Sequence, residues 1–186
     1  GRYAGAEAMK ALKSGLHVML FSDNVPIETE IELKKYALEN DLLMMGPDCG
    51  TSIINGVPLA FSNAVNKGNI GIIAASGTGL QEVSSIISEE GFGISQAIGT
   101  GGRDIKEKVG GMMFISSLDT LKDDENTDVI VLVSKPPHPA VLKKINAKLK
   151  NISKPVVSIF LGADSNLLKE SGAITAETLE EAALLA

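Results

Sequence analysis

Residues 71–82 read G-I-I-A-A-S-G-T-G-L-Q-E and contain the end of a strand, a tight turn and the start of a helix. The turn consists of small residues, which are Ser76, Gly77, Thr78 and Gly79. A helix start leaves backbone N–H groups unpaired and carries the positive end of the helix dipole, so it binds phosphate or carboxylate readily. Ser76 and Thr78 can cap the helix or donate a hydroxyl to an anion, and Thr78 and Gln81 have capping-box spacing. An ordinary strand–helix turn with small residues for packing is the alternative interpretation.

The alternation of strand and helix patterns continues on both sides of this stretch. Downstream, strands are expected at 92–98, 128–133 and 156–161, and helices at 79–90, 109–122, 140–150 and 178–185, with a loop and a helical turn at 162–172. Upstream, helices at 1–14 and 27–40 alternate with strands at 16–21 and 42–45, and residues 52–68 are interpreted as a linker with one short strand at 57–60. This pattern predicts an α/β fold with a parallel sheet, helices on both faces and ligands at the carboxyl ends of the strands.

The expected helices have amphipathic patterns. In the helix at 27–40, the candidates for the core are Ile27, Ile31, Tyr36 and Leu38. Its charged residues are expected to be mostly solvated: Glu28, Glu30, Glu32, Lys34 and Lys35. In the helix at 109–122, the residues expected to point inward are Met113, Leu118 and Leu121.

Composition excludes several classes of protein. The chain has 186 residues, of which 44% are hydrophobic, so it can form one large or two small cores. A formal net charge of −6, no basic cluster and 4% aromatic residues argue against nucleic acid or an anionic membrane as a partner. The apolar runs are of strand length, so no membrane span is expected. One cysteine and no visible signal peptide predict a cytoplasmic location.

The histidines and the cysteine form no complete catalytic or metal-binding pattern. His17, His138 and Cys49 lie far apart in the sequence, so no tightly bound metal is expected. His138 lies between prolines and is interpreted as a rigid loop residue, and Cys49 as a small buried thiol, with a reactive thiol as the alternative. Neither a Walker motif nor a G-x-S-x-G elbow is present.

Two cationic residues follow strand ends and are candidates for an anion pocket. If Arg103 and Lys135 converge on the turn at 76–79, their charges and the helix start would bind a phosphate or carboxylate together. If they do not converge, they are solvated surface charges. We therefore expect Ser76, Gly77, Thr78 and Gly79 to bind an anion, helped by Arg103 and Lys135.

Several turns, taken in order, resemble those of the α subunit of succinyl-CoA synthetase and its NDP-forming acyl-CoA synthetase relatives. They are G-P-D-C at 46–49, G-I-I at 71–73, S-G-T at 76–78, G-F-G at 91–93 and G-T-G-G at 99–102, followed by the strand at 129–133 and K-P-V-V at 154–157. The closest variant resembles the FdrA family through L-F-S-D-N-V at 20–25, A-S-G-T-G-L-Q-E at 75–82, G-G-R-D at 101–104 and V-S-K-P-P at 133–137.

This resemblance implies two domains. Residues 1–66 would be the C-terminal half of a Rossmann-like CoA-binding domain with its linker, and residues 67–186 a flavodoxin-like, doubly wound parallel-sheet ligase domain. In the synthetases, the turn that matches 76–78 holds the phosphate of a phosphohistidine, and the turn that matches 46–49 lies near the CoA thiol. The CoA-proximal residues implied here are Asn24, Pro26, Pro47, Asp48 and Cys49. CoA is the implied ligand, and a nucleotide and Mg²⁺ would enter only through a partner domain.

The sequence departs from the synthetase pattern at two places. Residues 162–167 read G-A-D-S-N-L where the synthetases carry their phosphorylated histidine in a G-H-A-G loop, and Lys135 stands where a supporting glutamate is found. FdrA-like proteins share both departures. We therefore expect a protein that handles an acyl phosphate, CoA or both at the turn at 76–79 without the usual phosphohistidine.

Two further functions stay open. FdrA-like proteins in purine-degradation operons are linked to oxamate carbamoyl transfer, so the chain could belong to an enzyme that uses carbamoyl phosphate. It could instead be a non-catalytic module that binds CoA or phosphate. As an enzyme it is expected to act as a subunit, with a β-type partner or as a homo-oligomer, because an incomplete first domain exposes a sheet edge and apolar faces.

Overall fold

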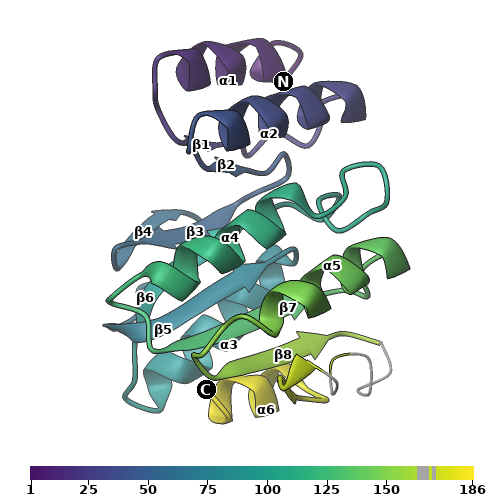
Figure 1. Ribbon diagram of the computed structural model, residues 1–186. Helices are drawn as coiled ribbons and strands as arrows, with labels where there is room; N and C mark the ends of the chain where they lie inside the picture. The colour runs from purple at the N-terminus through teal and green to yellow at the C-terminus, as the bar shows by residue number, and fades with distance from the viewer. Residues whose placement is uncertain (163–167, 169–170) are drawn as a thin grey trace.

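Residues 1–45 form a small α-β-α-β unit in the computed structural model, which describes residues 1–162, 168 and 171–186 (Figure 1). The elements of this unit are α1 (Ala4–Lys13), β1 (Val18–Met19), α2 (Ile27–Glu39) and β2 (Met44–Met45). The two strands pair in parallel, as predicted, but are shorter than expected. The core of the unit includes Leu12, Leu33 and Met44, and Met113 of helix α4 (Met112–Asp123) packs into it. The small unit therefore shares its core with the rest of the chain.

The remaining strands form one seven-stranded sheet in the order β4-β3-β6-β5-β7-β8-β9. Their bounds are β3 (Thr51–Ile54), β4 (Val57–Ala60), β5 (Lys67–Ala74), β6 (Ile94–Gly99), β7 (Val129–Ser134), β8 (Val156–Phe160) and β9 (Ile174–Thr175). Strands β6-β5-β7-β8-β9 pair in parallel, and in chain order they follow the 2-1-3-4-5 arrangement of flavodoxin-like folds. This topology confirms the predicted α/β fold with a doubly wound parallel sheet.

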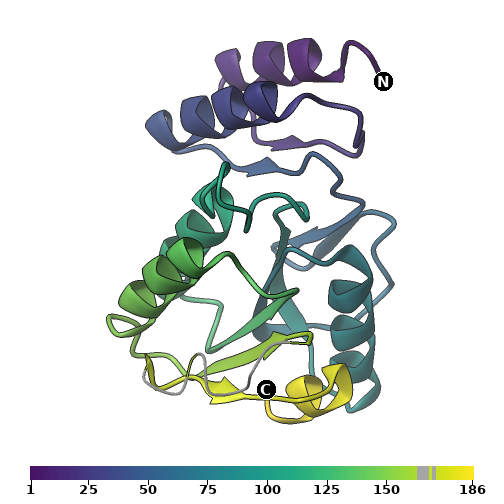
Figure 2. The same cartoon turned by 90° about the vertical axis from the view of Figure 1, so that its right-hand side faces the viewer.

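Helices cover both faces of the sheet (Figure 2). Helices α3 (Gly77–Glu89) and α6 (Leu179–Leu184) pack on one face, and α4 and α5 (Pro139–Leu149) pack on the other. Successive residues of a strand point to opposite faces, so Ile72 packs on the α3 side and Ile73 on the α4 side. None of the helices in the described ranges combines the length and apolarity needed to span a membrane.

The segment expected as a linker with one short strand, residues 52–68, contains a β-hairpin: the strand expected at 57–60 is confirmed as β4, and β3 was not expected. Strands β3 and β4 pair antiparallel, and β3 also pairs antiparallel with β6 of the main sheet. Asn55 and Gly56 connect β3 to β4 with φ values of 53° and 75°, as a two-residue type I′ turn requires. The hairpin thus extends the sheet expected for residues 67–186. The division of the chain at residues 66 and 67 stays a prediction.

The buried face of α2 differs from the predicted one. Glu30 and Lys34, expected in water, are both 0% exposed, whereas Leu38, expected in the core, is exposed. The reason is that α2 packs between α1 and the segment that leads into α4, so its charged stripe faces other charged groups instead of solvent. The expectations for α4 are confirmed, because Met113, Leu118 and Leu121 are buried. The helical turn expected at 162–172 falls largely on 163–167 and 169–170, outside the described residues.

Candidate functional site

A cavity of about 570 Å³ lies at the carboxyl ends of β5, β6 and β7. Its walls include parts of four turns: residues 75–78 after β5, the glycines of 99–102 after β6, Lys135 after β7 and residues 48–50 after β2. Strands β5 and β7 are the neighbours at which the order of a flavodoxin-like sheet reverses. Open α/β sheets bind their ligands at this switch point, so the cavity is the first candidate for the functional site.

The start of helix α3 opens onto this cavity. Ser76 is the N-cap, and its Oγ accepts a hydrogen bond from the Gly79 amide at 3.3 Å. Within the described residues, no acceptor is bound to the amides of Gly77 and Thr78. A side-chain carbon at Gly77 would meet no atom within 4 Å, so the backbone there faces open space. The turn therefore presents two amides and the Thr78 hydroxyl, which is what an anion needs.

Gln81 joins α3 to the hairpin instead of completing a capping box with Thr78. Its Nε2 donates to the Thr51 Oγ1 and to the Phe61 carbonyl, both at 2.9 Å. The Phe61 amide in turn donates to the Gly50 carbonyl at 2.9 Å. These bonds fix the end of β4 at the rim of the cavity.

Two exposed aromatic rings meet at the same rim. The ring centroids of Phe21 and Phe61 lie 5.3 Å apart with an interplanar angle of 58°. The two residues are 62% and 64% exposed, and both line the cavity. Gly50 lies beneath them, where a side-chain carbon would be 3.4 Å from the Phe61 ring. The pair offers an apolar surface next to the polar turn of α3.

The cationic residues are placed partly as predicted. Lys135 lines the cavity, and so does Lys106, which the sequence analysis did not single out. Arg103 was expected to converge with Lys135, but it points to the N-terminal unit. Its Nε lies 2.8 Å from Glu30 Oε2 as an ion pair, and its terminal nitrogen donates to the Val25 carbonyl at 2.9 Å. The buried Glu30 carboxylate requires a positive partner, and Arg103 is committed to it.

The turn at residues 46–49 also reaches the cavity. Asp48 and Cys49 line it, whereas Pro47 is buried behind them. Cys49 Sγ lies 3.5 Å from both the Thr51 carbonyl oxygen and Ser52 Oγ. Burial raises the pKa of the Cys49 thiol, against the smaller opposing effect of these hydrogen bonds. The thiol is therefore protonated at neutral pH, as the interpretation of a small buried thiol predicts.

The other two residues implied to lie near CoA are placed outside the cavity. Asn24 and Pro26 are exposed in the segment that leads into α2, and Pro26 is the N-cap of that helix. Among the described residues, neither is part of the cavity wall.

Both histidines have structural contacts. His138 is the N-cap of α5, where its Nδ1 accepts from the Ala140 amide at 3.3 Å, and His17 Nδ1 accepts from the Leu43 amide at 2.9 Å. In the part of the chain that the structure describes, no three His, Cys, Asp or Glu residues cluster so as to hold a metal ion. The loop that would carry a phosphohistidine, at 163–167, is outside the described residues.

The switch-point cavity and the flavodoxin-like sheet define an α/β protein of the class that binds ligands at the carboxyl edge of a parallel sheet. Residues 65–162, slightly more than half of the chain, match the CoA binding domain family. The chain belongs to this family. The matched range starts beside the expected domain boundary and holds the turn at 76–79, the glycine loop at 99–102 and Lys135. The assignment of CoA binding to residues 1–66 stays a prediction.

Relatives confirm the predicted kinship with acyl-CoA synthetases. The chain is 53% identical over 186 residues to the uncharacterized protein YahF of Escherichia coli, covering 100% of this chain and 36% of YahF. It is 27% identical over 173 residues to the ADP-forming succinate–CoA ligase subunit alpha of Methanothermobacter thermautotrophicus, covering 91% of this chain and 57% of that subunit. The chain therefore spans less than two thirds of the length of these relatives.

A solved structure shares the fold. It is the dinucleotide-forming acetyl-coenzyme A synthetase 1 of Ca. Korarchaeum cryptofilum, in complex with phosphate and ADP. The TM-score is 0.77 at 20% sequence identity, over 98% of this chain and 45% of that one. At this identity the likeness shows the fold alone.

Proposed function

We propose that the chain is the α-type part of an acyl-CoA synthetase-like enzyme and that its switch-point cavity binds an acyl phosphate, CoA or both. The observation that supports this most directly is the convergence of three features on one cavity. They are the start of α3, the lysines Lys106 and Lys135, and the turn that holds Asp48 and Cys49. The family match and the ligase relatives make CoA and acyl phosphates the first ligands to test.

The residues present fit a phosphoryl group. The amides of Gly77 and Thr78 and the Thr78 hydroxyl are placed to donate to phosphate oxygens, and Lys106 and Lys135 supply positive charge. Phe21 and Phe61 add an apolar rim for the carbon part of a ligand. In transfer of the acyl group to CoA, the sulfur would form a bond to the acyl carbon as the C–O bond to phosphate breaks, and the thiol proton would pass to the departing phosphate or to water. These donors would then stabilise the phosphate that leaves with the electron pair.

The acyl phosphate is proposed to bind directly, without a phosphohistidine. Lys135 replaces the glutamate that supports the phosphohistidine in the resembling synthetases, and a lysine favours a phosphorylated ligand in the cavity itself. His138 is committed to the α5 N-terminus and is not a phosphoryl carrier in this proposal.

Four finer expectations belong to the same proposal. The chain would be a member of the FdrA family, and its acyl phosphate would be carbamoyl phosphate, as in an oxamate carbamoyltransferase-type enzyme. It would assemble with a β-type subunit or a second copy that supplies nucleotide and Mg²⁺. Its location would be cytoplasmic. The 53% identity to YahF and the succinate–CoA ligase relatives support a subunit of this kind. A module that binds without catalysis is the alternative outcome of the test below.

The test is calorimetric titration of the protein with CoA, acetyl phosphate and carbamoyl phosphate, one at a time. In Gly77→Val the new side chain enters open space, so the fold is retained while the anion is crowded. We expect at least about a tenfold loss of acyl-phosphate affinity, equal to about 1.4 kcal/mol. Glu89→Val, which places the same residue in the last turn of α3, is the control and should bind as the native protein does.

Unchanged binding by Gly77→Val would contradict the assignment of the site. If the native protein binds none of the three ligands, the enzyme proposal fails and an assembly module becomes the better account. Binding without turnover in the presence of the partner subunit would favour the non-catalytic module.

A further inference from the structure

Four charged side chains form a cluster on the side of the glycine loop that faces helix α2: Glu30, Lys34, Arg103 and Asp104. Lys34 Nζ lies 2.8 Å from Glu30 Oε1 and 2.8 Å from Asp104 Oδ1. Glu30 Oε2 is paired with Arg103, so two acids and two bases leave the cluster without net charge. Lys34 and Asp104 are fully buried, as Glu30 is. The cluster has no spare positive charge for a ligand.

Besides its two ion pairs, Lys34 makes one hydrogen bond to the backbone of the glycine loop. Its ammonium donates to the Thr100 carbonyl at 3.0 Å, in the middle of the loop at 99–102. Gly99, Gly101 and Gly102 of the same loop line the cavity. The loop thus lies between Lys34 and the cavity, with the Thr100 carbonyl turned to the lysine and its glycines turned to the ligand space.

The glycines of this loop also pack closely against the turn at 46–49. A side-chain carbon at Gly99 would lie 2.6 Å from Cys49 Sγ, and one at Gly101 would collide with the Pro47 carbonyl oxygen. Asp104 fixes the end of the segment, because its carboxylate accepts from the amides of Met113 at 3.2 Å and Phe114 at 2.8 Å at the start of α4. At the centre of the loop, the Thr100 amide and hydroxyl donate to the Ala74 carbonyl at 2.8 and 3.3 Å, and Lys34 holds the Thr100 carbonyl from the side of α2.

We infer that Lys34 is a positioning residue for the anion site, although it is not among the described residues that line the cavity. It holds the Thr100 carbonyl so that Gly101 and Gly102 form the wall of the cavity, and it links helix α2 of the N-terminal unit to that wall. A buried charge cluster contributes little net stability compared with apolar packing, but loss of one partner leaves a buried charge unpaired, so the groups of this cluster are held to one another. The inference rests on the proposed function, since it concerns the same site.

The test compares Lys34→Met with Glu30→Gln. Glu30→Gln alters the same cluster but keeps the ammonium on Thr100 and Asp104, so it is the matched control. Two quantities are measured: amide hydrogen exchange by mass spectrometry, and acetyl phosphate affinity by calorimetry. The amides of Thr100 and Asp104 report on the loop, because they donate to the carbonyls of Ala74 and Gly101 in the native structure. The amides of β7 are the internal reference.

For Lys34→Met we expect exchange in the loop to rise at least about tenfold while β7 stays protected, and acetyl phosphate affinity to fall at least about tenfold. Glu30→Gln should leave loop exchange within about twofold of the native protein, and its acetyl phosphate affinity should not fall, because the change only frees Arg103 from its ion pair. A global rise in exchange that includes β7 would mean general destabilisation and would overturn the inference. Unchanged loop exchange, or unchanged affinity despite a loosened loop, would overturn it as well.

Lys34→Met leaves two buried carboxylates near one another and is at risk of not folding. The double variant Glu30→Gln/Lys34→Met removes one charge of each sign and keeps the cluster neutral, so it provides the same test in a chain that folds more readily. If the native protein does not bind acetyl phosphate, the proposed function fails. The exchange measurement then still decides whether Lys34 positions the loop.

Discussion

The ammonium of Lys34 and the carboxylate of Asp104 lie 2.8 Å apart, although 70 positions separate the two residues in the chain. The same carboxylate accepts hydrogen bonds from the amides of Met113 and Phe114 at the start of α4. One side chain therefore joins α2, the glycine loop and α4. This arrangement explains why the N-terminal unit and the main sheet share a core, and why Arg103 is drawn away from the cavity toward Glu30.

The buried pair predicts a large effect of Asp104→Ala on stability. The substitution leaves the Lys34 ammonium with one carboxylate fewer and removes the acceptor at the α4 N-terminus. We therefore expect the free energy of unfolding to fall by about 3–5 kcal/mol. Urea unfolding followed by circular dichroism measures this difference. Asp119→Ala is the control, because Asp119 also pairs with a lysine, Lys148 at 2.6 Å, but at the surface. It should change stability by about 1 kcal/mol or less. Equal changes in the free energy of unfolding of the two variants would show that burial does not make the Lys34–Asp104 pair more important for stability than a surface pair.

The glycine loop predicts a sharp difference between two adjacent positions. Gly101 has a φ of +82°, and a side chain there would strike the Pro47 carbonyl, whereas a side chain at Gly102 would make an ordinary contact of 3.7 Å with the Ala75 carbonyl. Gly101→Ala is expected to cost more than the roughly 1–2 kcal/mol of a left-handed alanine, because the turn at 46–49 must also move. Gly102→Ala should stay near the native value in the same urea titration. An unchanged free energy of unfolding in Gly101→Ala would mean that the turn at 46–49 can move at little cost.

The fold was largely accessible from the sequence because the parallel strands are short apolar runs that alternate with amphipathic helices. The turn at 76–79 was found for the same reason: glycines interrupt that pattern at a strand end. The hairpin was missed although Asn55-Gly56 is a strong signal for a two-residue turn. Residues 52–68 contain glycine, proline and asparagine with only scattered apolar residues, which is typical of a linker, and this outweighed the turn signal.

The charged cluster could not be found in the same way. The period of α2 shows which residues share a face, but it does not show whether that face meets water or another charged group far away in the chain. Glu30 and Lys34 were therefore assigned to solvent, and Arg103 was assigned to the cavity. Lys106 was missed because it lies in the irregular segment before α4, where no periodicity relates it to the strand ends.

The aromatic rim predicts different behaviour toward CoA and inorganic phosphate. Phe61→Ala removes one ring of the exposed pair, which should weaken CoA binding about 2- to 13-fold, as the loss of about 0.5–1.5 kcal/mol of aromatic contact implies. Phosphate affinity should not change, because the α3 amides and the lysines remain. Calorimetry with each ligand checks both expectations.

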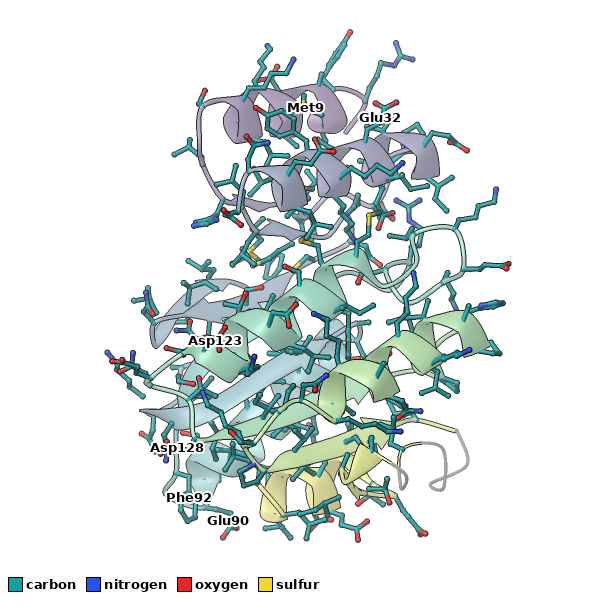
Figure 3. The ribbon with its side chains drawn as sticks, in the orientation of Figure 1. Met9, Glu32, Glu90, Phe92, Asp123 and Asp128 are labelled. Atoms are coloured by element: carbon teal, nitrogen blue, oxygen red, sulfur yellow. The ribbon has the colours of Figure 1, made fainter. Side chains whose placement is uncertain are left out.

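Phe92→Ala is the matched control for this experiment. Phe92 is 63% exposed, close to the value for Phe61, but it lies beside Glu90 at the opposite end of the molecule from Met9 and Glu32 (Figure 3). It should bind CoA as the native protein does. Equal loss of CoA affinity in the two variants would argue against a ligand contact at the rim, and loss of phosphate affinity in Phe61→Ala would indicate that the whole site has moved.

The buried thiol predicts an unusual pH dependence of alkylation. The thiolate is the reactive form, and burial raises the pKa of Cys49, so the folded protein holds a protonated thiol at neutral pH. Labelling by iodoacetamide should be slow at pH 7 and should accelerate only above the ordinary range of a thiol. In urea the burial is lost, so the pKa returns to its usual value and labelling should be faster at every pH below the raised one.

The measurement is straightforward because Cys49 is the single cysteine of the sequence, so each label reports one site. Mass spectrometry after timed labelling between about pH 7 and pH 10 gives the two profiles, and Cys49→Ala sets the background. Equal rates for folded and unfolded protein at pH 7 would contradict the raised pKa. Since Cys49 also lines the cavity, acetyl phosphate should slow labelling further at high pH in the native protein but not in Gly77→Val. That comparison separates protection by a bound ligand from protection by burial alone.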